Sequence, residues 1–299
     1  MKYHYINISP PYTLNKDWDA SEPQLPSGVF QELKNYRPEK ESLETRKGIT
    51  EFAFTASVTA APSGNDFSGD ANCVSVWNLE NNGNDSKGGN HLTMTGGVTY
   101  DNADYKQGSY SAVFEKASSQ YGIRDDGDLD AGTPGKSGES ETAFSVTGWI
   151  KPVTLGNWSG ILDKFNELLD QRSWLVMYNG SSNVISLYIG YNNGVDKTAL
   201  HHGTSMSINT WYHMGCVYNA ADNSMKIRMH TEAALMGVNA TGTAGGNMSP
   251  DASPIYMGRH VTSAGTTSDL DAKLDEVVLF KDVLTDGEID QIWAGTYGS

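Results

Sequence analysis

The sequence predicts an all-β protein, a two-sheet antiparallel jelly-roll sandwich that follows an extended N-terminal arm. From Cys73 onward, apolar and polar residues alternate with a period of two, and turn residues arrive about every ten positions. Glycine accounts for 32 of the 299 residues, well above the usual ~7%, as a protein with many turns requires. A single stretch near the C-terminus carries helix signals. Together these observations favour a sandwich or jelly roll.

Short strands account for the alternating pattern. They are expected at residues 73–79, 111–114, 120–123, 144–151, 159–163, 174–178, 184–191, 211–219, 224–229, 255–258 and 274–280. One helix is expected at residues 285–293, where Thr285 and Glu288 form an S/T-x-x-E capping box and Ile289 and Ile292 supply an apolar stripe. We expect this helix to close one end of the sandwich.

The apolar positions of these strands define the expected core. The residues expected between the two sheets are Val74, Val76, Phe144, Val146, Trp149, Leu187, Ile189, Trp211, Val217, Ile227, Val277 and Leu279. Burial of such side chains stabilises the sandwich by about 25 cal/mol per Å² of apolar surface. The buried tryptophans therefore need no functional explanation.

The chain divides near residue 65, which gives an arm at residues 1–68 and a sandwich domain at residues 69–299. Six of the ten prolines precede this point, and the apolar residues there are few and scattered. Such a segment cannot offset the entropy of ordering some sixty residues by itself. We expect another protein chain, or the body of the sandwich, to hold it.

Charge and composition exclude several classes of function. Lys plus Arg total 21 against 36 for Asp plus Glu, which gives a net charge of −15, so nucleic acid is not an expected partner. No apolar stretch approaches the ~20 residues of a membrane span. The N-terminus lacks the apolar core of a secretory signal, so ordinary signal-peptide export is not expected. Cys73 and Cys216 are compatible with one disulfide bridge or with two free thiols.

Several motifs, taken in order, resemble the concanavalin A-like, laminin-G-like domains. They are Val74–Trp77, Asn84–Thr93, Ser111–Phe114, Gln120–Ile123, Phe144–Pro152, Trp211–His213 with Val217–Tyr218, and Leu274–Val277 with Leu284–Ile292. The similarity spans residues 73–294 and implies a jelly-roll fold with a lectin-like recognition function. Loops carry the specificity in such a fold.

The same superfamily contains glucanases, so a catalytic function has to be considered. A retaining glucanase needs two carboxylates about 5–5.5 Å apart, usually on one strand as Glu-x-Asp-x-x-Glu. Glu288 and Asp290 match the first half of this pattern, but Trp293 stands in place of the second glutamate. We interpret Glu288 as a helix cap and predict no catalytic residue.

The resemblance also implies a structural calcium ion at the rim of the sandwich. Its expected ligands are Asn84 and Asp85 in the early glycine-rich loop and Asp275 near the last strand. Calcium takes six to eight oxygen ligands, which such a loop supplies from carboxylate, amide and carbonyl groups. The alternative is that Asp85 makes an Asx-turn and Asp275 a capping bond.

Sugar binding pairs an aromatic ring with a few amide and carboxylate groups. Two turns offer that mixture, one with Trp158 and one with Tyr191, Asn192 and Asp196. These residues are the expected ligand-binding residues. The alternative is that Trp158 plugs the edge of the sandwich and Tyr191 merely ends a strand.

The arm is similar to the N-terminal stretch of some tailed-phage virion proteins, through residues 25–30, 33–35 and 43–49. This similarity implies a non-catalytic virion component, of the tail or capsid, that binds other virion proteins through residues 1–62 and a cell-surface glycan of the host through the sandwich. Its expected location is the virion, extracellular after lysis. A secreted or cell-surface bacterial adhesin that binds carbohydrate is the alternative.

Overall fold

The structure is a computed structural model that describes residues 36–39, 42–45, 64–140, 143–156 and 158–298. The chain forms two units, residues 1–58 and 59–299. In the first unit, β1 (Tyr36–Glu39) pairs with β2 (Ser42–Thr45) in an antiparallel ladder that the sequence did not predict. Residues 64–68 of the predicted arm belong to the second unit, and the remaining residues of the arm lie outside the described residues.

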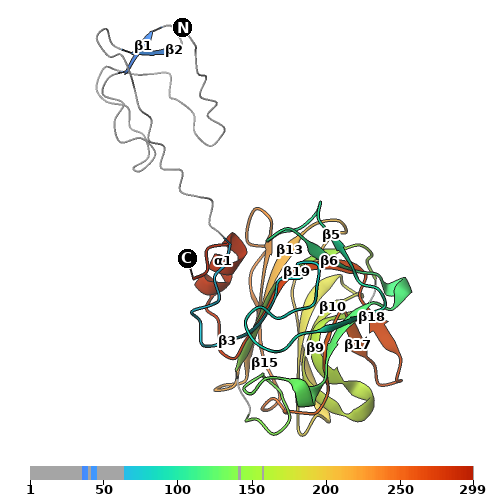
Figure 1. Ribbon diagram of the computed structural model, residues 1–299. Coiled ribbons are helices and arrows are strands. Elements are labelled where there is room, and N and C mark those ends of the chain that lie inside the picture. The colour runs from blue at the N-terminus through green and yellow to red at the C-terminus, as the bar shows by residue number, and fades with distance from the viewer. Residues whose placement is uncertain (1–35, 40–41, 46–63, 141–142, 157, 299) are drawn as a thin grey trace. The chain divides into compact units, whose positions relative to one another are not determined.

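The second unit is a sandwich of two sheets, as the sequence predicts (Figure 1). The first sheet has nine strands, and its long strands pair antiparallel with their neighbours. In spatial order they are β12 (Asp196–His201), β11 (Val184–Tyr191), β10 (Gln171–Asn179), β9 (Ser159–Asn166), β16 (Ile255–Met257), β7 (Tyr121–Arg124) and β4 (Thr93–Thr95), with β17 (Arg259–Val261) and β18 (Thr267–Asp269) beside β9.

The second sheet has eight strands, and β19 lies at its centre. In spatial order the strands are β15 (Ala240–Thr243), β14 (Ser224–Thr231), β13 (Tyr212–Asn219), β8 (Phe144–Pro152), β19 (Ala272–Phe280), β6 (Ser111–Phe114) and β5 (Thr99–Asp101), with β3 (Cys73–Trp77) also paired to β19. Single 3-10 turns occur at η1 (Lys116–Ser118), η2 (Asp126–Asp128) and η3 (Glu167–Leu169).

The main core lies between the two sheets and contains most of the predicted core residues. Those in it are Phe144, Val146, Leu187, Ile189, Ile227, Val277 and Leu279, with Val74 packed against them. Val76 and Val217 were wrongly predicted there, because they belong to a second cluster on the other face of the eight-stranded sheet. Trp149 and Trp211 are buried but lie outside both clusters.

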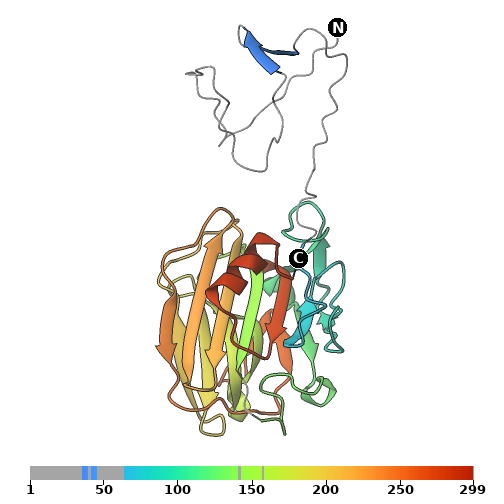
Figure 2. The ribbon, with the colours of Figure 1, turned by 90° about the vertical axis from the view of Figure 1, so that its left-hand side faces the viewer.

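Helix α1 (Asp286–Ala294) lies across one face of the eight-stranded sheet (Figure 2). It covers that second cluster. The predicted capping box is present, since Thr285 and Glu288 each bond the main-chain N–H of the other. Ile289 and Ile292, on the side of the helix that faces the sheet, are fully buried. The helix therefore lies over a face of the sheet instead of closing an end. Within the described part of the chain, no helix is long and apolar enough to cross a membrane.

The two cysteines are free and buried. Cys73 lies in the cluster beneath α1, whereas Cys216 lies in the core between the sheets. Burial raises the pKa of Cys73 to about 12. Of the two arrangements that the sequence left open, the structure has the free thiols.

Candidate ligand-binding site

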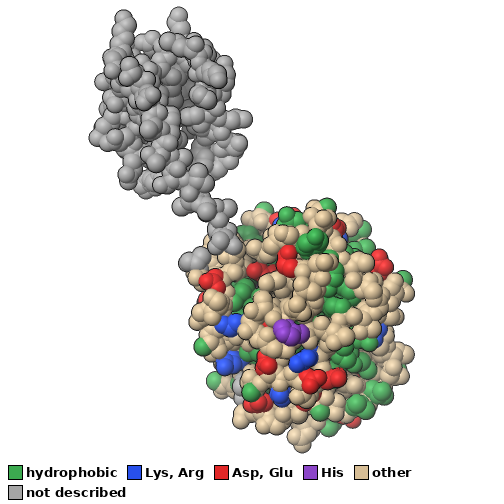
Figure 3. All heavy atoms as spheres, in the orientation of Figure 1, with side chains coloured by type: hydrophobic (Ala, Val, Ile, Leu, Met, Phe, Trp, Pro, Cys, Tyr) green, Lys and Arg blue, Asp and Glu red, His purple; other side chains and the backbone are tan. Residues whose placement is uncertain are grey.

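A hollow of about 430 Å³ lies on the outer face of the nine-stranded sheet. Side chains alternate along β10, so Trp174 and Val176 enter the core while Leu175 and Met177 face outward. On the side of the molecule that carries β17 and β18, hydrophobic side chains reach the surface among polar ones (Figure 3). The hollow is lined by Trp158, Glu167, Leu175, Met177, Tyr188, Lys197, His260, Thr262 and Ser268.

The floor of the hollow is apolar. Phe165, Leu175 and Met177 form a separate buried cluster, and the half-buried Tyr188 packs against it. This cluster lies on the solvent side of the sheet, where side chains are ordinarily polar. A concave apolar surface with a few polar groups around it is the usual form of a small-molecule site.

Trp158 immediately precedes β9 and lines the hollow. Its side chain is 41% exposed, whereas Trp174 is fully buried. Its exposed indole adds a flat apolar surface beside the floor. Such a surface can cover the apolar face of a pyranose ring.

An ion pair between Glu167 and Lys197 borders the hollow. The ammonium group of Lys197 also lies 5.7 Å from the ring centroid of Tyr188 and 6.0 Å from that of Phe165. Burial acts to raise the pKa of Glu167, but its hydrogen bond to Lys197 and the charge of Lys197 hold this pKa below its ordinary value. The pair thus brings two groups of opposite charge close to the apolar floor.

A second pair, of a carboxyl and an imidazole, connects the hollow to the buried layer beneath its floor. Nδ1 of His260 on β17 is 3.1 Å from Oδ2 of Asp163 on β9. The two residues are 3% and 0% exposed, and burial raises the pKa of Asp163 to about 7. The other carboxyl oxygen of Asp163 is buried and has no hydrogen-bond partner among the described residues. His260 lines the hollow, so the pair is connected to it directly.

A second hollow, of about 410 Å³, is more open and more polar. It is lined by Asn192, Asn193, Asn247, Met248, Ser249 and Pro250. Nδ2 of Asn192 donates to Oδ2 of Asp196 at 2.9 Å, and Asp196 is the first residue of β12 and does not lie in a turn. The ring of Tyr191 lies against Gly245 and Gly246, where an added Cβ on Gly245 would come within 2.4 Å of the phenol oxygen.

The predicted ligand-binding residues are therefore divided between two places. Because β9, β10 and β11 are antiparallel, Trp158 at the start of β9 and Tyr191 at the end of β11 lie at opposite ends of the sheet. Trp158 lines the apolar hollow, and Asn192 lines the polar one. Tyr191 is the last residue of β11 and lines neither hollow.

The residues of the predicted calcium site have main-chain partners. Oδ1 of Asp85 accepts hydrogen bonds from the N–H groups of Val76 and Lys87, both at 2.9 Å, so Asp85 makes the Asx-turn of the alternative interpretation. Asn84 is exposed. Burial raises the pKa of Asp275 to about 7, although the main-chain N–H of Lys106 donates to its Oδ2 at 2.6 Å.

The described residues contain no cluster of three or more His, Cys, Asp or Glu side chains placed to hold a metal ion. The calcium site stays a prediction.

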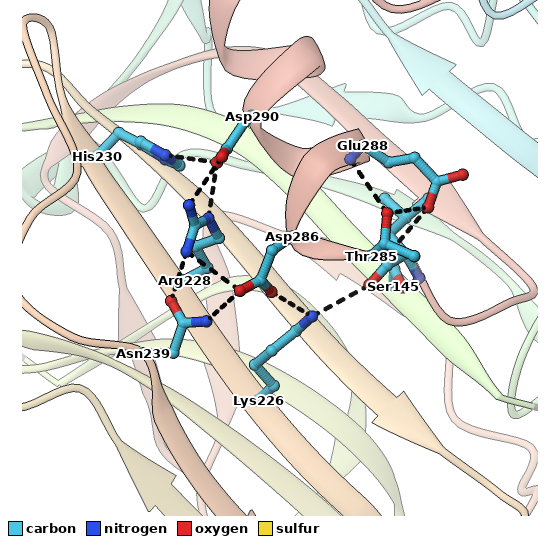
Figure 4. Close-up of polar contacts among 10 residues, drawn as sticks. Ser145, Lys226, Arg228, His230, Asn239, Thr285, Asp286, Glu288 and Asp290 are labelled. Atoms are coloured by element: carbon cyan, nitrogen blue, oxygen red, sulfur yellow. Dashed lines mark hydrogen bonds and ion pairs between the residues drawn. The ribbon is translucent and has the colours of Figure 1, made fainter.

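Figure 4 shows how the glucanase-like motif on α1 is used. Asp290 forms a two-point ion pair with Arg228, at 2.7 and 2.8 Å, and accepts from Nε2 of His230 at 2.9 Å. Asp286 binds Lys226 at 2.7 Å. These contacts attach the helix to β14. The interpretation of Glu288 as a cap is confirmed.

Sequence reasoning missed most of the residues that line the apolar hollow: Glu167, Leu175, Met177, Tyr188, Lys197, His260, Thr262 and Ser268. It also missed Asp163, which contacts His260. One local signal was present, since residues 174–178 are apolar without interruption. A strand apolar on both faces is covered on both faces or carries a ligand.

The chain belongs to the concanavalin A-like lectin/glucanases superfamily. The family model matches residues 124–290, more than half of the chain. This assignment agrees with the resemblance in the sequence and with the two-sheet sandwich. No curated protein sequence matches the chain.

Solved structures share the fold at low sequence identity. The binding domain of botulinum neurotoxin serotype D/C is 14% identical with a TM-score of 0.50, and the match covers 76% of this chain but about half, 53%, of that one. The CBM40 of the Ruminococcus gnavus IT-sialidase, solved with α2,3-sialyllactose, is 10% identical with a TM-score of 0.41, over 52% of this chain and 83% of that one. At 14% identity, the likeness to the neurotoxin binding domain is one of fold alone.

Proposed function

We propose that the protein is a non-catalytic glycan-recognition protein that binds a sugar in the apolar hollow. The observation that carries this proposal is Trp158, an exposed aromatic side chain at a hollow with an apolar floor. A sugar needs such a surface for its apolar face and a few polar groups for its hydroxyls. His260, the Glu167–Lys197 pair and the hydroxyls of the lining supply the latter.

The motif on α1 supports a binding function over a hydrolytic one. Glu288 forms the capping box with Thr285, and Asp290 accepts hydrogen bonds from Arg228 and His230. A general acid requires a carboxyl that faces the scissile bond with a raised pKa. Hydrogen bonds and charge from Arg228 instead hold the pKa of Asp290 below its ordinary value.

The setting that we propose is a tailed-phage virion, where residues 1–62 attach the protein to other virion proteins and the sandwich binds a host-surface glycan. The support is the similarity of the arm to virion proteins. A secreted or cell-surface adhesin remains the alternative. Mass spectrometry of purified particles and of cell-surface fractions distinguishes these two locations.

The glycan proposal is tested with the full chain on a glycan array. Trp158→Ala removes the exposed ring, and we expect a loss of about tenfold in affinity for the selected glycan, because an aromatic contact contributes about 0.5–1.5 kcal/mol beyond its buried area. The side chain is 41% exposed and therefore partly buried, so the unfolding free energy should also fall, by about 1–3 kcal/mol.

Tyr105→Ala is the matched control, because Tyr105 is also 41% exposed and does not line either hollow. It should bind as the wild type does. Equal binding by Trp158→Ala and the wild type would place the glycan site elsewhere. Absence of binding to any glycan would contradict the proposed function itself.

A further inference from the structure

The Asp163–His260 pair determines what the floor of the hollow offers to a ligand. Oδ2 of Asp163 and Nδ1 of His260 form a hydrogen bond of 3.1 Å, and both side chains are almost fully buried. His260 lines the hollow, and its Nδ1 is engaged by Asp163. Nε2 is therefore the ring nitrogen that remains for a ligand.

The protonation of this pair sets the hydrogen-bonding character of Nε2. In the less protonated form, Asp163 is a carboxylate and neutral His260 donates to it from Nδ1, so Nε2 is an acceptor. One added proton reverses this character whichever partner receives it. On His260 it makes an imidazolium, and on Asp163 it makes an acid that donates to Nδ1 and leaves the ring proton on Nε2. In both cases Nε2–H becomes a donor.

We propose that the hollow takes a 2-acetamido sugar whose carbonyl oxygen accepts a hydrogen bond from Nε2–H of His260. This inference rests on the proposed glycan function. The acetamido carbonyl only accepts, so it needs the protonated pair, and the adjacent methyl group suits the apolar floor of Leu175 and Met177. A sugar hydroxyl both donates and accepts, so it binds Nε2 in either form.

Protonation of the pair involves Asp163, whose carboxyl has a raised pKa. Burial raises the pKa of Asp163 to about 7, while the hydrogen bond and charge of His260 act to lower it. The other charged or titratable groups that face the pair are Lys164, Glu167, Lys197, Asp251 and Tyr256. Lys164 pairs with Asp126 at 2.7 Å and with Asp251 at 3.5 Å, and Lys197 pairs with Glu167. The donor form is consequently favoured below neutral pH and the acceptor form above it.

Calorimetry on the full chain tests this inference. The ligands are the methyl glycosides of N-acetylglucosamine and N-acetylgalactosamine, with methyl glucoside and methyl galactoside for comparison, at about pH 5.5 and about pH 8.5. We expect the Kd of an acetamido glycoside to rise about fivefold or more at the higher pH. The Kd of the plain glycosides should change less than about twofold.

Two variants distinguish the contribution of His260 to the pH dependence of the Kd from general effects of pH on the protein. His260→Gln offers an amide N–H at every pH, so the ratio of the two Kd values should fall to about one. His91→Gln is the matched control, because His91 is exposed and lies outside the hollow, and it should keep the wild-type ratio. Nitrogen NMR of the wild type adds a readout that needs no variant, with the proton of His260 expected on Nδ1 at about pH 8.5.

The outcomes distinguish this inference from the function on which it rests. Sugars that bind without preference for the acetamido group, or with no pH dependence, would overturn the inference and leave glycan recognition standing. A His260 proton found on Nε2 at the higher pH would also overturn it. If no sugar binds in the array or in calorimetry, the proposed function fails, and the inference fails with it.

Discussion

At the scale of single residues, the buried carboxylates show how strongly local partners decide a role. Asp85 is 4% exposed and Asp275 is fully buried, and their oxygens accept hydrogen bonds from main-chain N–H groups. Hydrogen bonds to a charged acceptor are stronger than neutral ones. Removal of the carboxylate would leave its donors without a partner, which lowers the unfolding free energy by about 1–3 kcal/mol for each buried donor.

The calcium prediction and its alternative give different melting curves. An ion present at a hundred times its Kd stabilises the fold by about 2.7 kcal/mol, so a chelator should lower the Tm of the wild type but not that of Asp275→Ala. If the carboxylates serve only the main chain, chelation changes nothing, while Asp85→Ala lowers the unfolding free energy by about 2–3 kcal/mol. A wild-type Tm that does not change in chelator would contradict the predicted calcium site.

The candidate site was predictable only in part. Trp158 was found because an aromatic beside an amide in a turn is a local pattern. The Asp163–His260 contact joins positions 97 residues apart, and no periodicity or spacing in the sequence brings them together. The register of β9 beside β17 creates this pair, and that register follows from tertiary packing.

At the scale of elements, the long strands were predicted because their alternation is strong, and the short ones were missed. The missed strands include β12 and β15 at the edges of the two sheets, whose residues are exposed or half-buried. Edge strands of this kind carry little apolar signal. Alternation also could not say which face of a strand meets the core. Val76 and Val217 face the layer that α1 supplies, so both faces of the eight-stranded sheet are apolar.

Strand β19 contains a bulge that buries two adjacent acids. The ladder with β8 shifts register between Asp275 and Val278, and Glu276 has a φ of 45°, which strains a residue other than glycine. Burial raises the pKa of Glu276 to about 8, while a hydrogen bond from Asn65 acts to lower it. The acid therefore binds its proton more tightly in the folded state.

The unfolding free energy should consequently fall as the pH rises from the ordinary pKa of a glutamate to the raised pKa of Glu276. Between about pH 4.5 and pH 8 the folded state keeps the proton of Glu276 and the unfolded state does not, so stability decreases across that window. Glu276→Gln keeps an oxygen acceptor for Asn65 and removes the titration. We expect its Tm to fall less than that of the wild type between pH 5 and pH 8. Parallel Tm profiles for the two proteins would show that Glu276 is not protonated in the fold.

At the scale of the whole molecule, the two chain ends of the sandwich are joined to each other. Asn65 donates from Nδ2 to the carbonyl of Ile292 at 2.9 Å, and its Oδ1 accepts from the N–H of Tyr297 at 3.0 Å. The main-chain N–H of Asp66 donates to the carbonyl of Tyr297 at 2.8 Å. The described part of the second unit thus begins with residues that its own C-terminal segment holds.

This arrangement sets where the arm can be removed. If residues 1–62 serve only as an anchor, a chain of residues 63–299, which keeps Asn65, should have a Tm within about 2 °C of the full chain. A chain of residues 67–299 loses Asn65. Its unfolding free energy should be lower by about 2 kcal/mol, which lowers the Tm by about 5 °C. Calorimetry measures this difference. The 63–299 chain should still bind its glycan but be missing from assembled particles analysed by mass spectrometry, because the attachment lies in the deleted residues. Its incorporation at the level of the full chain would contradict the anchor and place the attachment on the sandwich itself.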